Sequence, residues 1–292
     1  MKDNPKFLSI FLLILLSLIW GTSFILIKQG LKVFAPDEVG ALRVTAASLF
    51  LLPFALIRLR ELTRVDYFKL FVSGSMGIFI PAFLFAWAQT RLESSLAGIL
   101  NTLSPLWTMI FGGLFFGQRF KGYTILGIII SFGGAIMLTL SRSAGTISGF
   151  NMYGLLIVIA CALYGANLNW LKFKIHNLGS ITITSVSLLL VGPLAAAYLF
   201  GFTSFTSKLT EVPGAWLAFG FIVLLAFMST AIANLIFTKL LKISTPLFAS
   251  SVTYVMPIVA VMWGVLDGEK LLIGHFIGMT AILGGVYLAN RK

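Results

Sequence analysis

Long apolar runs separated by short polar connectors are the dominant pattern of this chain. Ten runs approach the roughly 20 residues that an α-helix needs to cross the hydrocarbon core of a bilayer. Their approximate bounds are residues 7–27, 39–57, 68–88, 95–116, 123–140, 152–171, 181–200, 215–237, 246–266 and 273–289. The pattern predicts an all-α polytopic membrane protein with ten transmembrane helices.

The pattern of the first half returns in the second half. Residues 20–28 read aromatic, Gly, a small residue, a polar residue, a mostly apolar run and Lys. Residues 164–172, 144 positions later (164 minus 20), read the same way. A second repeated motif relates residues 103–105, which end in Pro105, to residues 255–257, which end in Pro257. The chain therefore contains an internal repeat.

Counting spans gives this repeat an orientation. Five spans, an odd number, precede the second copy, so the second half enters the membrane in the opposite sense. The longest connector, residues 141–151, divides the chain into residues 1–145 and 146–292. We predict two inverted five-helix repeats with a substrate site where the two halves meet.

Composition and charge agree with a membrane protein and give it a direction. The chain is 59% apolar and only 10% charged, against about 25% charged in soluble domains. Its net charge of +12 is scattered between the apolar runs, which argues against nucleic-acid binding. Of 21 Lys and Arg residues, 14 fall on one predicted side and 6 on the other, with Arg43 inside a span. The positive-inside rule then predicts a multi-pass protein of the cytoplasmic (inner) membrane with both termini in the cytoplasm.

Several chemical classes are disfavoured because their residues are missing. No Asp or Glu lies well within the ten runs, although such a carboxylate is the usual proton or sodium site of a coupled transporter. No His/Asp/Glu cluster has metal-ligand or acid–base spacing, and there is no P-loop. We therefore predict no enzyme activity, no cofactor, no metal site and no direct use of ATP.

Polar uncharged residues recur at helical spacing in spans that the repeat relates to each other. Each stripe alone fits hydrogen bonding between helices, but their recurrence in both halves favours a shared polar cavity. The stripes are Asn101, Ser104 and Thr108; Ser250, Thr253 and Pro257; Thr230, Asn234 and Thr238; Tyr164 with Asn167; and Trp20 with Ser23.

Two other features have alternative interpretations. Phe79 and Phe83, with Trp87 on the same helical face, either line an aromatic binding site or face lipid and core. Arg43 lies about one turn into the second run, where it either contacts an anionic group or snorkels to the interface. Pro105 and Pro257 each remove a backbone hydrogen bond, and we predict that the helices bend there as hinges.

A set of short motifs occurs in order along both halves of the chain: Trp20-Gly21, Ala41-Leu42-Arg43, Ala46-Ala47, Pro105, Gly117 and Gly127 in the first half, and Tyr164-Gly165, Pro257, Gly268-Glu269, Gly278 and Gly284-Gly285 in the second. In these residues the chain resembles the EamA-type family of the drug/metabolite transporter superfamily. The resemblance implies a ten-helix inverted repeat around a cavity that binds small metabolites, often amino acids. It also implies that Thr102, Ser104, Tyr254 and Met256, next to the two prolines, face this cavity. The first half departs from the pattern, with Gln118 where the second half has Glu269.

We predict a secondary transporter that exports small organic metabolites, amino acids first, by alternating access through the bilayer. The alternatives are another substrate class (a drug, a nucleobase or a phosphorylated metabolite) and a non-transporting membrane subunit. Its partners are expected to be the small-molecule substrate and lipid, with the protein a monomer or a weak homodimer. The predicted substrate-binding residues are Trp20, Ser23, Phe79, Phe83, Asn101, Thr102, Ser104, Tyr164, Asn167, Asn234, Thr253, Tyr254 and Met256.

Overall fold

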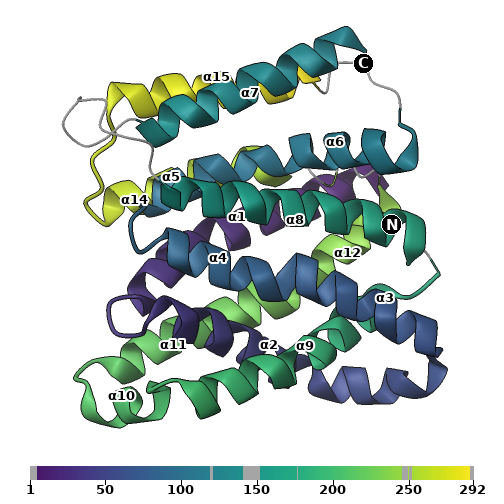
Figure 1. The fold of residues 1–292 in the computed structure, drawn as a ribbon, viewed down its shortest axis with the longest axis vertical. Helices are drawn as coiled ribbons and strands as arrows, with labels where there is room; N and C mark the ends of the chain where they lie inside the picture. Colours follow the sequence, from purple (N-terminus) through teal and green to yellow (C-terminus); the bar gives the residue numbers. More distant parts are fainter. Residues whose placement is uncertain are drawn as a thin grey trace.

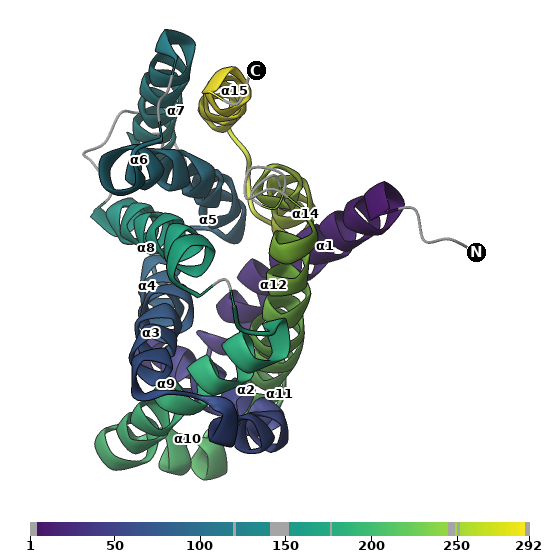
Figure 2. The same cartoon turned by 90° about the vertical axis from the view of Figure 1, so that its right-hand side faces the viewer.

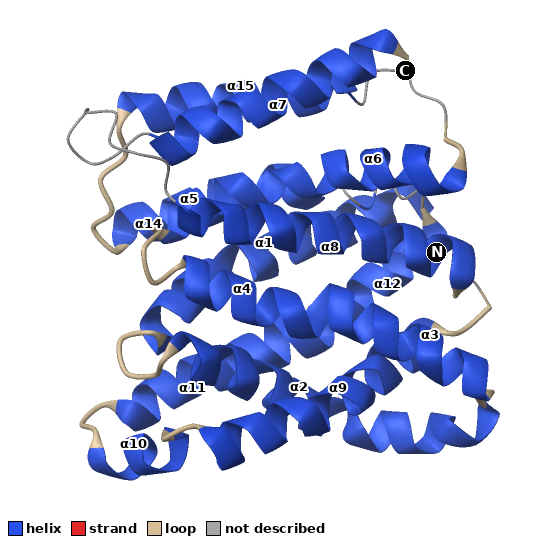
Figure 3. Ribbon diagram, viewed as in Figure 1, coloured by secondary structure: helices blue, strands red, loops and turns tan. Residues whose placement is uncertain are grey.

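The computed structural model describes residues 5–118, 121–140, 152–175, 177–244, 249 and 252–289. Within these ranges the chain forms helices and no strands (Figures 1 and 3). In chain order the elements are α1 (Pro5–Gly30), α2 (Pro36–Arg58), η1 (Leu59–Glu61), α3 (Arg64–Gly74), η2 (Ser75–Phe79), α4 (Ile80–Ala88), α5 (Ser94–Leu100), η3 (Asn101–Leu103), α6 (Ser104–Phe116), α7 (Gly122–Leu140), α8 (Met152–Lys174), α9 (Ser180–Phe202), α10 (Phe205–Glu211), α11 (Ala215–Leu225), η4 (Ala226–Ile232), α12 (Ala233–Ile243), α14 (Val252–Leu266) and α15 (Ile273–Ala289).

The prediction of an all-α membrane protein is confirmed. Seven helical segments of the described chain are long and apolar enough to cross a bilayer, and three further apolar helices are shorter. The seven are Leu8–Gly30, Pro36–Arg58, Arg64–Ala88, Ser94–Phe116, Met152–Lys174, Ser180–Phe202 and Ala215–Ile243. The shorter three are Gly122–Met137, Val252–Leu266 and Ile273–Leu288. Helix therefore occurs in every predicted run; Ser250, the start of the ninth run except Ala249, and the connector 141–151 lie outside the described residues.

The main helix pairs join the first part of the chain to the second. α7 packs on α15, α2 on α9, α1 on α14 and α6 on α8. Figures 1 and 2 show α7 and α15 together at one edge of the bundle and α2 and α9 toward the opposite edge. The helices between these edges surround the space described below.

Glycines allow the closest of these contacts. A Cβ at Gly21 would lie 2.5 Å from Val259 Cβ, where α1 meets α14. A Cβ at Gly165 would lie 2.6 Å from the backbone of Trp107, where α8 meets α6. Val259 and Trp107 each follow a motif proline by two positions. Each aromatic-Gly motif therefore packs against the helix of the other half that contains the motif proline, α14 with Pro257 or α6 with Pro105.

Three membrane segments change helix type part-way. The segment from α3 to α4 contains the π-helical η2, the one from α11 to α12 contains the π-helical η4, and α5 passes to α6 through the 3₁₀ turn η3. η3 has a local cause, since Pro105 has no N–H to donate to the Asn101 carbonyl. Ser104 Oγ donates to that carbonyl instead, at 2.9 Å. Departures of this kind often mark functional sites in helices.

Candidate substrate site

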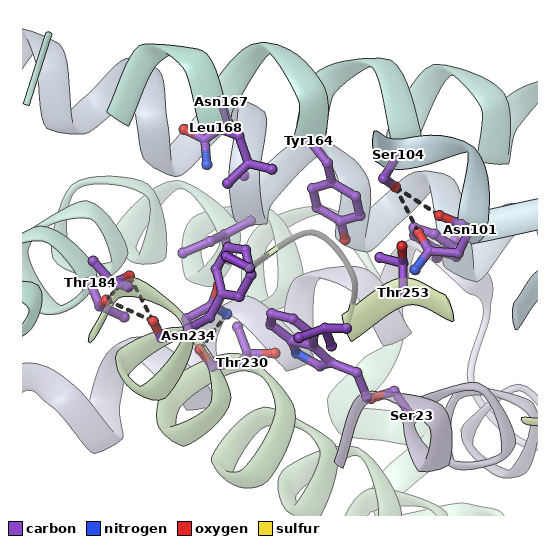
Figure 4. Close-up of a pocket in the computed structure, with 18 of the residues that line it drawn as sticks. Ser23, Asn101, Ser104, Tyr164, Asn167, Leu168, Thr184, Thr230, Asn234 and Thr253 are labelled. Atoms are coloured by element: carbon purple, nitrogen blue, oxygen red, sulfur yellow. Dashed lines mark hydrogen bonds between the residues drawn. The ribbon is translucent and has the colours of Figure 1, made fainter. Parts of the chain in front are cut away.

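A cavity lies between the helices and is lined by residues from both parts of the chain (Figure 4). The space not filled by atoms, counted together with its opening to solvent, is about 1180 Å³, which is room for a small organic ligand. Its lining reaches Leu171, Ile183 and Thr238, close to where α8 ends, α9 begins and α12 ends. At the other end of the bundle it stops at Phe24, Ile27 and Phe85.

Most of the predicted site residues line this cavity. Those that do are Trp20, Ser23, Asn101, Ser104, Tyr164, Asn167, Asn234, Thr253 and Met256. The structure therefore brings the polar positions of α1, α8, α12 and α14 to one space, together with η3 and the start of α6. Whether they bind substrate stays a prediction.

Four predicted residues lie outside the lining: Phe79, Phe83, Thr102 and Tyr254. Phe83 packs between Phe79, at 5.1 Å between ring centroids, and Tyr198, at 6.1 Å. Thr102 is fully buried and donates to the Ile99 carbonyl of its own helical segment. Tyr254 packs against the main apolar core. Adjacent helical residues differ by about 100° around the axis, so neighbours of a lining residue point elsewhere.

Asn101 and Ser104 form a polar corner beside the broken helix. Ser104 Oγ also lies 3.3 Å from Asn101 Oδ1, and Asn101 Nδ2 donates to Met256 Sδ at 3.9 Å. The buried thiol of Cys161 donates to the Asn101 carbonyl as well. The corner thus connects η3 and α6 with α8 and α14. Ser104, which precedes Pro105, and Met256, which precedes Pro257, both take part in it.

A second polar group lies along α12 and η4. Asn234 Nδ2 donates to the Thr230 carbonyl at 2.8 Å, and Thr238 Oγ1 donates to the Asn234 carbonyl at 2.7 Å. Thr184 of α9 shares a hydroxyl–hydroxyl hydrogen bond of 3.3 Å with Thr238 (Figure 4). On the opposite wall, Ser73 donates to Asn167 Oδ1 at 2.8 Å. These side chains line the cavity and form hydrogen bonds with backbone carbonyls and with one another.

Aromatic rings form the apolar part of the wall. Trp20 packs on Phe237 with centroids 5.1 Å apart, and its indole N–H donates to the Ser229 carbonyl at 2.9 Å. Phe85 packs between Phe24, at 5.9 Å, and Tyr164, at 6.1 Å. The cavity therefore has aromatic surfaces near its polar corners, which suits ligands with both kinds of surface.

Arg43 lines this cavity. It is half-buried, and its Nε donates to Thr230 Oγ1 at 2.8 Å. Of the two interpretations of this residue, the structure places it where it can contact a bound molecule. Its position in the second run was visible in the sequence, but the direction in which it points was not.

Other lining residues had weaker signals in the sequence. Ser73, Thr184 and Ser187 line the cavity but were not predicted, although Thr184 and Ser187 lie in the hydroxyl-rich stretch of residues 180–187. Hydroxyl residues occur in many membrane helices, so this composition alone did not indicate a cavity. Phe85 and Phe237 are two of 27 phenylalanines. No local pattern separates them from the others, because the packing of distant helices decides which rings face the cavity.

An ionic cluster, which we call the closed-end cluster, adjoins the end of the cavity that Phe24 and Ile27 line; it consists of Lys28, Ser94, Ser95, Asp267 and Glu269. Lys28 Nζ lies 2.7 Å from Glu269 Oε1 and 2.8 Å from Asp267 Oδ2. Glu269 also accepts the Ser94 N–H at 2.8 Å, the Ser95 N–H at 3.1 Å and the Ser95 hydroxyl at 2.7 Å. The cluster joins α1 and α5 to the connector that follows α14.

Glycines make room for this arrangement. Gly268 has a φ of 84°, a left-handed conformation that directs the chain back after α14. A Cβ at Gly264 would lie 3.0 Å from Glu269 Cδ, so a side chain at this position would displace the carboxylate from where it now lies.

The pKa values of the carboxylates follow from these contacts. Burial works against the charge on Glu269, but the hydrogen bonds from Lys28, Ser95 and Ser94 outweigh it and lower its pKa. The hydrogen bond from Lys28 lowers the pKa of Asp267. Glu93 is next to the cluster, and burial together with the negative charge of Glu269 raises its pKa. Glu269 is therefore held as a carboxylate at neutral pH.

No group of three or more His, Cys, Asp or Glu residues that could hold a metal ion occurs in the part of the chain that the structure describes. The cavity chemistry is thus that of hydrogen bonds, aromatic surfaces and one guanidinium.

The sequence model of the EamA-like transporter family matches this chain in two segments, residues 7–140 and 151–291. The chain belongs to this family. It is similar to the uncharacterized inner membrane transporter YedA of Escherichia coli K12, with 28% identity covering 94% of this chain and 88% of YedA. It is also similar to an uncharacterized transporter of Archaeoglobus fulgidus, with 25% identity covering 94% of this chain and 95% of the other.

The fold of this EamA-like protein also occurs in a solved crystal structure of another protein. The two agree with a TM-score of 0.67 and 18% identity, covering 97% of this chain and 96% of the other. Family and relatives agree that this is a multi-pass membrane protein, and they support transport of small molecules as its activity.

Proposed function

We propose that this EamA-like protein is a secondary transporter that exports small organic metabolites, with amino acids as the first class, by alternating access. The observation that carries the proposal is the cavity between the two parts of the chain, with polar and aromatic walls. Its lining ends below the closed-end cluster and extends toward the opposite end of the bundle. A cavity of this kind is expected of one state in an alternating-access cycle.

The proposed architecture is two inverted five-helix repeats, residues 1–145 and 146–292. The helix pairs support it, because exchanging the two halves converts the α1–α14 pair into the α8–α6 pair and maps α7–α15 and α2–α9 onto themselves. The family match in two successive segments supports it as well. In this architecture the halves rock about the cavity, with Pro105 and Pro257 as hinges; the 3₁₀ turn before Pro105 supports the first of these.

The proposed orientation has both termini in the cytoplasm and the protein in the inner membrane. It is supported by the 14 to 6 excess of basic residues on the side where the chain begins. The closed-end cluster then lies on the outer side, and the cavity extends toward the cytoplasm. Export would begin from such a state, with substrate entering from inside.

Counterflow in proteoliposomes tests the proposal. Liposomes preloaded with unlabelled amino acids should take up the labelled form, and Asn101→Ala and Asn234→Ala should each reduce the initial rate by about 10-fold or more, since each change unpairs buried groups. Thr280→Ala is the matched control, because Thr280 is exposed on α15, away from the cavity. It should transport at the wild-type rate.

The outcomes separate the levels of the proposal. Absence of counterflow for every metabolite in the panel would refute transport, and wild-type rates in both Asn variants would refute the cavity as the route. Because no carboxylate lines the described part of the cavity, a pH gradient should change the rate little. Strong acceleration by the gradient would contradict an uncoupled mechanism.

A further inference from the structure

The charge inside the cavity is unbalanced. Arg43 is the only Lys, Arg, Asp or Glu among the described residues that line it. An arginine is protonated at all physiological pH values, so the cavity wall carries a fixed positive charge. The unbalanced charge is a property that a bound molecule can use.

Four carboxylates elsewhere in the described chain are engaged away from the cavity. Glu38 pairs with Lys208 at 2.7 Å, and Asp37 accepts a hydrogen bond from Tyr198 at 3.0 Å. Asp267 and Glu269 pair with Lys28 in the closed-end cluster. None of these groups is among the residues that surround Arg43 in the cavity.

The guanidinium of Arg43 uses only one of its five N–H donors within the described chain. Nε donates to Thr230 Oγ1, and the two terminal amino groups have no hydrogen-bond acceptor among the residues that the structure describes. The hydrogen bond to the Thr230 hydroxyl fixes the Nε side of the guanidinium. The free edge of a guanidinium matches the two oxygens of a carboxylate, which it binds through two parallel hydrogen bonds.

Tyr164 adds a second donor to the same cavity wall. Its side chain lines the cavity together with Arg43, and its hydroxyl forms no hydrogen bond within the described residues. The ring is held on Phe85, and Figure 4 shows the hydroxyl directed into the cavity. A carboxylate beside Arg43 would therefore find a further O–H donor, while the rings of Trp20 and Phe237 offer an apolar surface for the rest of the molecule.

We propose that the cavity recognises the carboxylate of its substrate through Arg43 and Tyr164 and needs no amino group on it. This inference rests on the transport function proposed above. The cavity lining in the described chain offers no acidic side chain to an ammonium group, so removing the amino group from a substrate removes no ionic contact. Removing the carboxylate leaves Arg43 as an unpaired charge in a partly dehydrated site, which is unfavourable.

Matched compound series test the proposal on purified full-length protein. Leucine is compared with 4-methylpentanoate, which lacks the amino group, and with 3-methylbutylamine, which lacks the carboxylate. Phenylalanine, 3-phenylpropanoate and 2-phenylethylamine form the second series. Binding is measured as the ligand-induced rise in melting temperature, and inhibition of counterflow is measured in proteoliposomes. We expect the amino acids and the acids to bind and the amines to bind about 10- to 100-fold more weakly.

Three variants assign the selectivity to its residues. Arg43→Gln should abolish the preference for acids over amines, and Tyr164→Phe should weaken acid binding by about 3- to 10-fold without changing amine binding. Arg64→Gln is the matched control, because Arg64 is an exposed arginine at the start of α3. The melting temperature without ligand shows whether Arg43→Gln is folded, and Tyr164→Phe carries the test if it is not.

The results also distinguish this inference from the transport function. Equal binding of acids and amines, or unchanged preference in both Arg43→Gln and Tyr164→Phe, would overturn carboxylate recognition. Failure of every acid in both series to bind would overturn carboxylate recognition as well. Counterflow of an uncharged or cationic solute would leave transport standing while refuting the inference, whereas no counterflow of any solute would refute transport itself.

Discussion

Replacing Glu269 by Gln tests how the cavity is closed at one end. The side chain keeps its size, so the packing above Gly264 is conserved, but the negative charge is lost. Lys28 loses its 2.7 Å ion pair, and the amide nitrogen of Gln must face either Lys28 or the donors of Ser94 and Ser95. We expect the variant to populate a state in which this end is open.

The structure sets the size of the effect. Removing one partner of a fully buried ion pair costs about 3–5 kcal/mol, and hydrogen bonds to charged groups contribute about 1.5–3 kcal/mol each. The Glu269 side chain is 2% exposed but that of Lys28 is 30% exposed, so water partly compensates the lysine. We therefore expect a loss of about 2–3 kcal/mol, which shifts the ratio of closed to open states by about 30- to 150-fold.

A spin-label distance across the closed end measures this shift. Lys32 and Lys270 are exposed near the cluster, on the connectors after α1 and α14, and can carry labels in a background where the buried Cys161 is replaced by Ala. Pulsed electron–electron double resonance should show one short distance between the two labels in the wild type. Glu269→Gln should add a longer distance, and counterflow should change with it if opening limits the rate.

Asp267→Asn is the matched control. Asp267 contacts the same lysine at 2.8 Å, but its side chain is 24% exposed and no backbone N–H donates to it in the described chain. A pair that exposed contributes at most about 1 kcal/mol, so the distance distribution should stay close to that of the wild type. Equal shifts in the two variants, or no shift in Glu269→Gln, would refute the buried carboxylate as the group that holds this end closed.

Two further predictions concern stability. The raised pKa of Glu93 means that its charge opposes folding fully above that pKa, and this cost disappears as the pH falls to the ordinary pKa of a glutamate. Glu93→Gln should therefore raise the melting temperature at neutral pH, with a difference from wild type that shrinks as the pH falls toward that ordinary value; a difference independent of pH would contradict this. Gly285→Ala should cost about 1–3 kcal/mol, because its Cβ would lie 2.5 Å from the Gly127 carbonyl oxygen. Gly284→Ala has no atom within 4 Å and should be neutral or slightly stabilising, so equal melting temperatures for the two alanine variants would contradict the close packing of α7 on α15.

The helices could be predicted well because their signal is local. In a bilayer each spanning segment must satisfy its own backbone hydrogen bonds, so about 20 apolar residues in a row suffice to identify one. The additional helix α10 and the π-helical segments η2 and η4 were not predicted. A π-bulge depends on one backbone register shift, and only η2 lies next to a proline, Pro81, that could have indicated it.

The site could be predicted in part because the repeat marks equivalent positions in both halves. Trp20 and Tyr164 both line the cavity, as their matching places in the repeat suggested. Phe83 and Phe85 show the limit, since both are apolar rings in one helix and only Phe85 faces the cavity.

The sequence by itself determined the membrane class, the family and the internal repeat, since hydropathy, charge bias and motif order are properties of the chain alone. Only the tertiary structure decided where the charges meet. Lys28 and Glu269 are 241 residues apart, and their ion pair exists because α1 packs on α14. Arg43 became a cavity residue because Thr230, 187 residues away, holds its guanidinium there. Helix propensity and hydropathy act within one segment, whereas contacts between segments depend on how all the helices pack at once.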